Sequence, residues 1–198
     1  FWVTTWPMLA RGCKIRFADI HPNSLNIDPA TIEPLVNEKT RAIYVVHYGG
    51  QAVDMDPVME IARRPNLRVV EDCAHAAGAT YRGRKAGALG DIGVFSFHQQ
   101  KNMTTLGEGG LVTTSDPQLY ERMLSYRSLC CLTYDPKGKY RPIDENVRPM
   151  GKRYWLLDFA DVGYNYRMTD AQAAVGLVQL AKLEAFNQRR REIAALYH

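Results

Sequence analysis

The chain has 198 residues, 46% of them hydrophobic, which is enough to bury one sizeable core. Its formal net charge of +4 is too small and too evenly spread to indicate nucleic-acid binding, although it suits a small anionic ligand. No apolar run approaches the roughly 18 residues of a membrane span, and no signal peptide is visible.

Short apolar runs alternate with helical stretches along most of the chain. The runs expected to form strands are 14–19, 42–46, 67–71, 92–97 and 111–114. Such alternation is typical of a largely parallel sheet with helices on both faces. The sequence therefore predicts an α/β fold, a three-layer α/β/α sandwich with a mostly parallel sheet.

Aspartate precedes proline at three places where a helix is expected to begin. The carboxylate can cap the free amides of the first turn, and the fixed φ of proline suits that turn. The three pairs are Asp28-Pro29, Asp56-Pro57 and Asp116-Pro117.

A last, amphipathic helix is expected after Thr169, which stands at capping-box spacing from Gln172. Its expected apolar stripe comprises Ala174, Leu177, Val178, Ala181, Phe186, Ile193 and Tyr197. Between 127 and 161, prolines and glycines interrupt regular structure while aromatic residues recur. That segment is predicted to be a functional loop, bordering either a ligand pocket or a subunit interface.

The four cysteines, Cys13, Cys73, Cys130 and Cys131, do not have metal-ligand spacing. Adjacent cysteines such as Cys130 and Cys131 are poor candidates for a structural disulfide. The sequence therefore predicts no metal site and a reduced, cytoplasmic setting.

Lys101 lies between the apolar run 92–97 and the glycine-rich turn 107–110. Lysines are mostly solvated, and the glycines alone are explained by a tight turn. A lysine held in this position, however, is also suited to forming a Schiff base. That chemistry requires an amine that is uncharged for part of the time, which burial and cationic neighbours favour.

A second segment supplies groups that a pyridoxal phosphate (PLP) cofactor requires. The run 67–71 ends in the carboxylate of Glu71, and that of Asp72 follows directly. A carboxylate at a strand end can hold the proton on the pyridine nitrogen of PLP. Asp72 is the candidate for this role. Ser96, five residues before Lys101, offers a hydroxyl to the phosphate. His75 can cover the ring face or bind its 3-hydroxyl group, although a histidine among alanines can equally be a core residue.

Five motifs occur in the order found in one enzyme family. They span 45–56, 71–75, 96–102, 107–110 and 163–168. With them the chain resembles the DegT/StrS family of sugar aminotransferases, which are fold-type I PLP enzymes. The resemblance implies that Asp72 binds the pyridine nitrogen, Ser96 contacts the phosphate and Lys101 forms the Schiff base. His75 is implied to contact the ring or its 3-hydroxyl group, although many members have glutamine there.

The resemblance also implies a shared site. The asparagine of the Gly-Tyr-Asn-Tyr-Arg motif typically reaches the phosphate of the neighbouring subunit's cofactor, which assigns that role to Asn165 and implies a homodimer. His98 resembles a position that lines the substrate pocket in some sugar aminotransferases.

The implied activity is PLP-dependent transamination of a keto-sugar, linked to a nucleotide or a phosphate, with glutamate as the amino donor. One alternative is a PLP-dependent sugar dehydratase, although relatives that dehydrate replace the lysine by histidine. Another is a non-catalytic regulatory or scaffold protein that retains the fold.

Two domain segments are expected. Residues 1–168 correspond to the large PLP-binding domain, and 169–198 to a long helix that leads toward a small C-terminal domain. Family members usually begin with a further phosphate-cradling turn at a helix N-terminus, which predicts that the chain is the central portion of a longer enzyme, incomplete at both ends.

Overall fold

The computed structural model describes residues 1–64, 66–134, 140–142 and 158–197. They form two compact units. The first comprises Phe1–Thr113 and Ala171–His198, and the second Thr114–Asp170.

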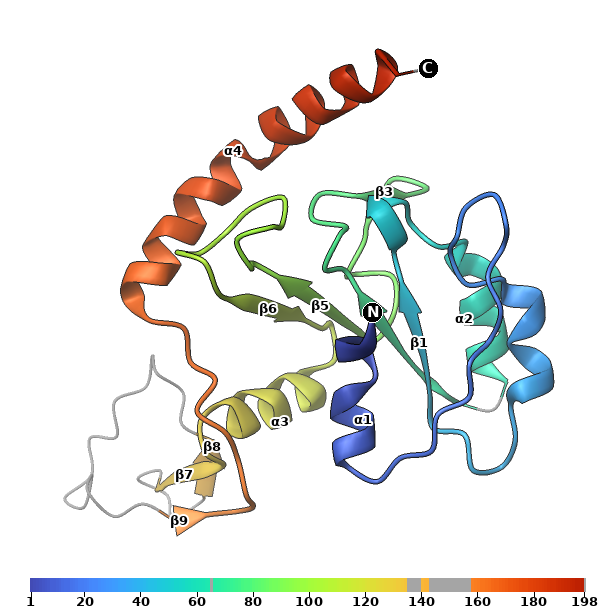
Figure 1. Cartoon of the computed structure of the whole chain (residues 1–198). Coiled ribbons are helices and arrows are strands. Elements are labelled where there is room, and N and C mark those ends of the chain that lie inside the picture. The colour runs from blue at the N-terminus through green and yellow to red at the C-terminus, as the bar shows by residue number, and fades with distance from the viewer. Residues whose placement is uncertain (65, 135–139, 143–157, 198) are drawn as a thin grey trace. The chain divides into compact units, whose positions relative to one another are not determined.

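The first unit is built on a four-stranded sheet (Figure 1). Its strands are, in spatial order, β1 (Ala42–Val46), β2 (Arg68–Asp72), β5 (Ile92–Ser96) and β6 (Gly110–Thr113). The pairs β1–β2 and β2–β5 are parallel, and β6 runs antiparallel to β5. The mostly parallel sheet predicted from the sequence is thus confirmed.

One face of this sheet is buried beneath the helix α2 (Met55–Arg63). Side chains alternate along each strand, so Ile43, Val45 and Val69 point to the same side. There they pack against Met55 and Val58 of the helix. Burial of each such side chain stabilises the fold by about 1.5–3 kcal/mol, which makes this the main core.

The opposite face is more open and carries Asp72. On it, Val94 and Val112 are 39% and 50% exposed. The single turn η1 (Trp2–Thr4), which precedes the short helix α1 (Trp6–Ala10), reaches this face because Thr4 Oγ1 donates to Asp72 Oδ2 at 2.8 Å. Helical elements therefore contact both faces.

The segment 14–19 was expected to be a strand, and this prediction is wrong. It forms no ladder with any of the described residues. Its chain is held instead by local contacts, in which Asp28 N donates to Asp19 O at 2.9 Å and Ile20 pairs with Ile27 in an isolated bridge. The following turns η2 (Pro29–Thr31) and η3 (Glu33–Leu35) are single 3-10 turns.

The three Asp-Pro pairs have different outcomes. Asp116 caps α3 (Pro117–Arg127), accepting from Gln118 N at 2.9 Å and Leu119 N at 3.3 Å. Asp28 caps only the turn η2. Asp56 does not cap α2, because that helix already begins at Met55 with Asp54 as its N-cap.

A tight turn between β2 and β5 presses against the sheet. It follows the hairpin of β3 (Thr80–Tyr81) and β4 (Arg84–Lys85). Gly87 has φ +84, and a Cβ added there would lie 2.4 Å from Phe95 Cζ. A Cβ on Gly93 would lie 2.4 Å from Gly87 Cα, so the turn fits against β5 only because both positions are glycine.

The second unit contains α3 and three short antiparallel strands in the order β8-β7-β9. They are β7 (Cys131–Tyr134), β8 (Tyr140–Pro142) and β9 (Asp158–Phe159). Part of the segment 127–161, which was expected to be a loop, therefore forms strands. Its residues 135–139 and 143–157 lie outside the described residues.

The helix α4 (Asp170–Ala195) begins directly after Thr169, as expected. Its predicted apolar stripe is not the face that it buries. Leu177 and Val178 are 70% and 55% exposed, whereas the buried residues of the helix are Leu183 and Asn187. The helix packs through these two residues, four positions apart, against the turn after β2.

The close approach at Gly93 generates the first prediction. Gly93→Ala should lower the free energy of unfolding by about 3 kcal/mol, because the new methyl group would meet backbone atoms of Gly87 that cannot rotate away. Gly83→Ala is the control, since a Cβ there meets nothing within 4 Å and only its positive φ costs about 1 kcal/mol. Equal losses of unfolding free energy in the two variants, measured by urea unfolding, would contradict this packing.

Candidate active site

Two of the predicted site residues end neighbouring parallel strands. Asp72 is the last residue of β2, and Ser96 is the last of β5. Asp72 lies opposite Val94 in the ladder, and Ser96 follows two positions later, so all three side chains share one face. Ligands of open α/β sheets bind at such carboxyl ends.

The Asp72 carboxylate is half-buried and retains capacity for a further donor. Its Oδ2 accepts from Thr4 Oγ1 at 2.8 Å, and its Oδ1 accepts from Ala74 N at 3.0 Å. An ionised carboxylate has about four lone-pair sites, of which these contacts use two. Asp72 can therefore accept another hydrogen bond, including one from a protonated ring nitrogen.

His75 lies exposed in the turn after β2, close to the 3-10 turn η4 (Tyr48–Gly50). Its Nδ1 accepts from Gly49 N at 3.4 Å, and its ring meets Tyr48 edge-on with centroids 6.0 Å apart. Gly50 has φ +87, and a Cβ there would come within 3.0 Å of His75 O. The glycine thus lets η4 approach the His75 turn closely.

Lys101 lies on the loop between β5 and β6. Backbone hydrogen bonds hold the loop closed, including one from Phe97 N to Gly109 O at 2.8 Å. The buried side chains of Met103 and Thr105 anchor it. Among the described residues, none forms a hydrogen bond or ion pair with Lys101 Nζ. A half-buried lysine, whose amine has no partner among the described residues, is thus presented on this loop.

Ser96 and His98 lie at the start of the same loop. Ser96 Oγ accepts from His98 N at 3.4 Å, so its hydroxyl hydrogen remains available for donation. His98 Nε2 is 3.9 Å from Glu108 Oε1, and His98 Nδ1 accepts from Gln100 N at 3.3 Å.

A cavity of about 490 Å³ brings His75 and Lys101 together. Gly49 and Gly50 line it as well. Asp72, Ser96 and His98 are not among its lining residues, although Ala74, which donates to Asp72, is.

Asn165 belongs to the second unit, where it forms an isolated bridge with Ser128. Its predicted role at a neighbouring subunit's cofactor stays a prediction.

The helix α4 contributes three cavity residues that the sequence did not indicate: Asn187, Arg190 and Arg191. Asn187 Nδ2 donates to Ala77 O at 2.9 Å, which ties the helix to the turn after β2. The one signal in the sequence was an asparagine four positions after Leu183, since helical residues at that spacing share a face. The direction of the arginines could not be derived without the tertiary packing.

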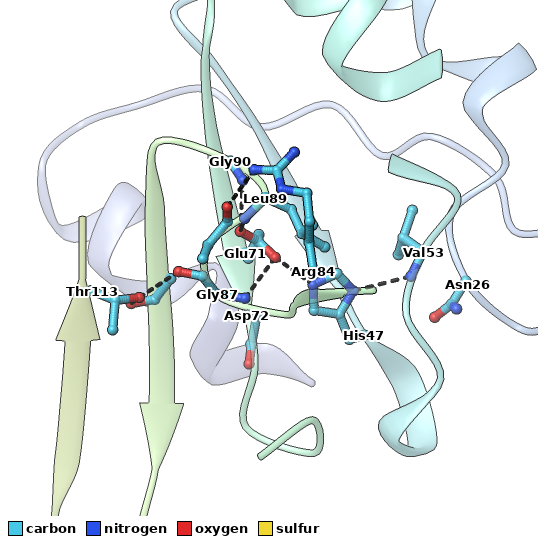
Figure 2. A network of polar contacts seen from close by, with 12 residues as sticks. Asn26, His47, Val53, Glu71, Asp72, Arg84, Gly87, Leu89, Gly90 and Thr113 are labelled. Carbon is cyan, nitrogen blue, oxygen red and sulfur yellow. Dashed lines mark hydrogen bonds and ion pairs between the residues drawn. The ribbon is translucent and has the colours of Figure 1, made fainter. Parts of the chain in front are cut away.

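A buried polar network lies beneath the sheet face opposite to Asp72. The side chains of Glu71 and His47 are both 0% exposed, and Glu71 Oε2 accepts from His47 Nε2 at 2.9 Å. Figure 2 shows Glu71 directed toward His47 and the turn 87–90, while the Asp72 carboxylate points away. Glu71 also accepts from Gly87 N at 2.8 Å, Leu89 N at 2.8 Å and Gly90 N at 2.7 Å.

These contacts fix the protonation of both side chains. Burial raises the pKa of Glu71, but the hydrogen bonds from His47 and three backbone amides outweigh it and hold the pKa below its ordinary value. His47 Nδ1 accepts from Val53 N at 3.0 Å and so carries no proton, which leaves Nε2 as the donor to Glu71. Glu71 is therefore a buried anion beside a neutral histidine.

Cys73 completes a cluster of metal-ligand type with His47 and Glu71, whose ligand atoms lie within 4.8 Å of one another. The ligand atoms of His47 and Glu71 are already engaged in the hydrogen bonds described above. Burial, followed by the negative charges of Glu71 and Asp72, raises the pKa of Cys73 to about 12, so its thiol stays protonated. Among these three side chains, a hydrogen bond joins His47 and Glu71, and Cys73 places a protonated thiol beside them.

Comparison with protein families decides the family. The model of the DegT/DnrJ/EryC1/StrS aminotransferase family matches residues 1–198. The chain belongs to this family. GDP-perosamine synthase of Caulobacter vibrioides is 44% identical over 186 residues, which cover 94% of this chain and 44% of that protein.

Solved structures of the family share the fold. PseC of Helicobacter pylori, an aminotransferase of pseudoaminic acid biosynthesis, is 34% identical with a TM-score of 0.86, covering 100% of this chain and 48% of that one. The dehydratase ColD, a GDP-4-keto-6-deoxymannose-3-dehydratase, is 29% identical with a TM-score of 0.83. The match covers 98% of this chain and 50% of that one. The chain thus spans about half the length of the relatives that it matches. Among its described helices, none combines the length and apolar character that crossing a membrane requires.

The lowered pKa of Glu71 generates a pH prediction. Glu71→Gln should lower the free energy of unfolding by about 2 kcal/mol near neutral pH, the scale of hydrogen bonds to a buried charge. Because the pKa is lower in the folded state, this contribution is complete above the ordinary value of 4.5 and is lost as the pH falls through the folded value. The difference between wild type and variant should therefore shrink below that pH in denaturant titrations.

Glu60→Gln, at an exposed residue paired with Arg64, is the matched control and should show almost no difference at any pH. If the loss of unfolding free energy in Glu71→Gln stays constant from neutral to acidic pH, the charge of Glu71 does not stabilise the fold.

Proposed function

We propose that the protein catalyses PLP-dependent transamination of a keto-sugar, with glutamate as the amino donor. The observation that carries this proposal is the placement of Lys101. Its amine has no partner among the described residues, and it lines a cavity with His75. The adjacent strand ends supply Asp72 and Ser96.

The residues present fit the cofactor chemically. Asp72 has lone pairs for a protonated ring nitrogen, Ser96 has a hydroxyl for a phosphate, and Lys101 has an amine for an aldehyde. At the cavity edge, Gly50 permits a close approach of backbone that a side chain would prevent. PLP, when bound, supplies an electron sink for a substrate carbon that loses a proton.

Each residue then has a distinct task. Lys101 Nζ would hold the cofactor covalently and also move a proton to and from the substrate carbon. Asp72 would keep the proton on the ring nitrogen. Ser96 would donate to the phosphate, and His75 would lie against the ring or its 3-hydroxyl group. His98, at the start of the Lys101 loop, would contact the sugar.

The charges around the cavity favour an anionic substrate. Lys101, Arg190 and Arg191 line it, whereas no aspartate or glutamate does among the described residues. Arg191 is paired with Glu184 at 3.1 Å, so Arg190 is the arginine left for an external anion. A sugar linked to a nucleotide or a phosphate meets this requirement, and GDP-perosamine synthase is named for such a product.

The proposed assembly is a homodimer with shared sites. The family resemblance of the motif around Asn165 supports it, because an isologous interface would supply two such asparagines at once. A cytoplasmic location is proposed as well. The four cysteines, all free in the structure, support a reduced setting.

Sugar dehydration is the competing chemistry on the same fold, as the likeness to ColD illustrates. Position 101 distinguishes the two activities, because it carries lysine here and dehydrating relatives replace that lysine by histidine. A non-catalytic protein that merely retains the fold would bind no cofactor at Lys101.

Chemical trapping tests the proposal. After incubation with PLP and reduction with borohydride, the cofactor should be recovered by peptide mass spectrometry on Lys101, because that amine is unpartnered and lines the cavity. Lys101→Ala should remove the label, while Lys39→Ala, at an exposed lysine, should keep it. Label on another lysine, or none on the wild-type protein, would refute the assignment of Lys101.

A further inference from the structure

Glu71 is a buried charge that the proposed chemistry does not use. Its side chain is 0% exposed, and its hydrogen-bond partners among the described residues are four donors: His47 Nε2 and the backbone amides of Gly87, Leu89 and Gly90. We call these five residues the Glu71 cluster. A buried carboxylate is costly unless such donors satisfy it, so this arrangement requires an explanation beyond core packing.

His47 joins the cluster to Asp72. Its side chain donates to Glu71, while its backbone N donates to Asp72 O at 3.1 Å. Its Nδ1 accepts from Val53 N at 3.0 Å, which orients the ring. His47, which directly follows the end of β1, thus binds both the side chain of Glu71 and the main chain of Asp72.

The turn 87–90 joins the cluster to the other strands. Three of its amides donate to Glu71, and Gly87 O accepts from Thr113 Oγ1 of β6 at 2.5 Å. Cys73 N, directly after Asp72, donates to Val94 O of β5 at 2.8 Å. The end of β2 is therefore fixed from β1, from the turn, and from β5.

We propose that Glu71 and His47 are positioning residues that hold the Asp72 carboxylate in place for the ring nitrogen of the cofactor. The proposal rests on the function proposed above. Asp72 follows Glu71 directly and projects from the opposite face (Figure 2). Any displacement of the Glu71 backbone would therefore displace Asp72 as well. Among the described residues, the carboxylate itself has only Thr4 and the adjacent Ala74 as hydrogen-bond partners.

The chemistry of the donors explains why this residue is glutamate. A glutamine of the same shape would place its NH₂ group either against His47 and Gly87 or against Leu89 and Gly90. In both orientations, donors would face donors, and two N–H groups, at least one of them buried, would lose their acceptor. The tautomer of His47 cannot adapt, because Val53 N occupies its Nδ1.

Native-state hydrogen exchange of Glu71→Gln tests the proposal without the cofactor. The backbone amides of His47 and Ala74 report on Asp72, since they donate to its main-chain and side-chain oxygens. Their protection should fall at least tenfold relative to wild type, together with that of Leu89. Val58→Ala, in the core beneath the sheet, is the control for a general loss of stability. It should not selectively lower the protection of the His47 and Ala74 amides from exchange.

The wild-type protein provides a second measurement if the variant does not fold. Under increasing denaturant, the His47, Ala74 and Leu89 amides should exchange through one common opening reaction. Exchange of Ala74 and His47 that is independent of Leu89, or that is unchanged in Glu71→Gln while Leu89 loses protection, would overturn the proposal. In that case the cluster holds the turn but not Asp72.

Cofactor titration separates this proposal from the proposed function. Glu71→Gln should bind PLP at least tenfold more weakly than Val58→Ala, as followed by absorbance. If the wild-type protein binds no PLP, the proposed function fails, whereas the exchange experiment still decides whether Glu71 positions Asp72. Equal PLP affinity of the two variants would contradict the positioning role.

Discussion

The structure depends on one buried anion that has no cationic partner among the described residues. Glu71 stays ionised because hydrogen bonds from His47 and three backbone amides replace the water it has lost. These donors come from the end of β1 and from the turn before β5. A single carboxylate thereby holds together the edge of the sheet where ligands of this fold class bind.

The candidate site is assembled around that edge. Asp72 is placed by the strand end, His75 by the turn that follows it, and Lys101 by the closed loop after β5. Buried Asn26 extends the same network, because it accepts from Tyr48 N at 2.8 Å and donates to Gln51 O at 3.0 Å around η4. Hydrogen bonds of the backbone thus act together with side-chain packing to position the groups around the cavity.

The sequence predicted the elements whose signals are local. The apolar runs of β1, β2 and β5 and the Asp116 cap needed only neighbouring residues to be recognised. The segment 14–19 was misassigned because strand propensity does not supply a pairing partner. The buried face of α4 was missed because Asn187 is polar, and its burial depends on the hydrogen bond to Ala77, which is distant in sequence.

Within the site, the sequence identified the motif residues but not the residues that hold them in position. Asp72, Ser96 and Lys101 were found from their spacing, whereas Glu71 was noted only as the carboxylate next to Asp72. Its partners lie 16 to 24 positions away, so no local pattern could reveal them.

The ionisation of Glu71 is measured most directly by NMR, following its carboxyl carbon as the pH is lowered. Because four donors stabilise the charge, the chemical shift of a carboxylate is predicted to persist below pH 4.5, the ordinary pKa of the group. Titration at or above pH 4.5 would contradict the ionisation of Glu71 in the folded state. It would mean that the four hydrogen bonds do not stabilise the anion.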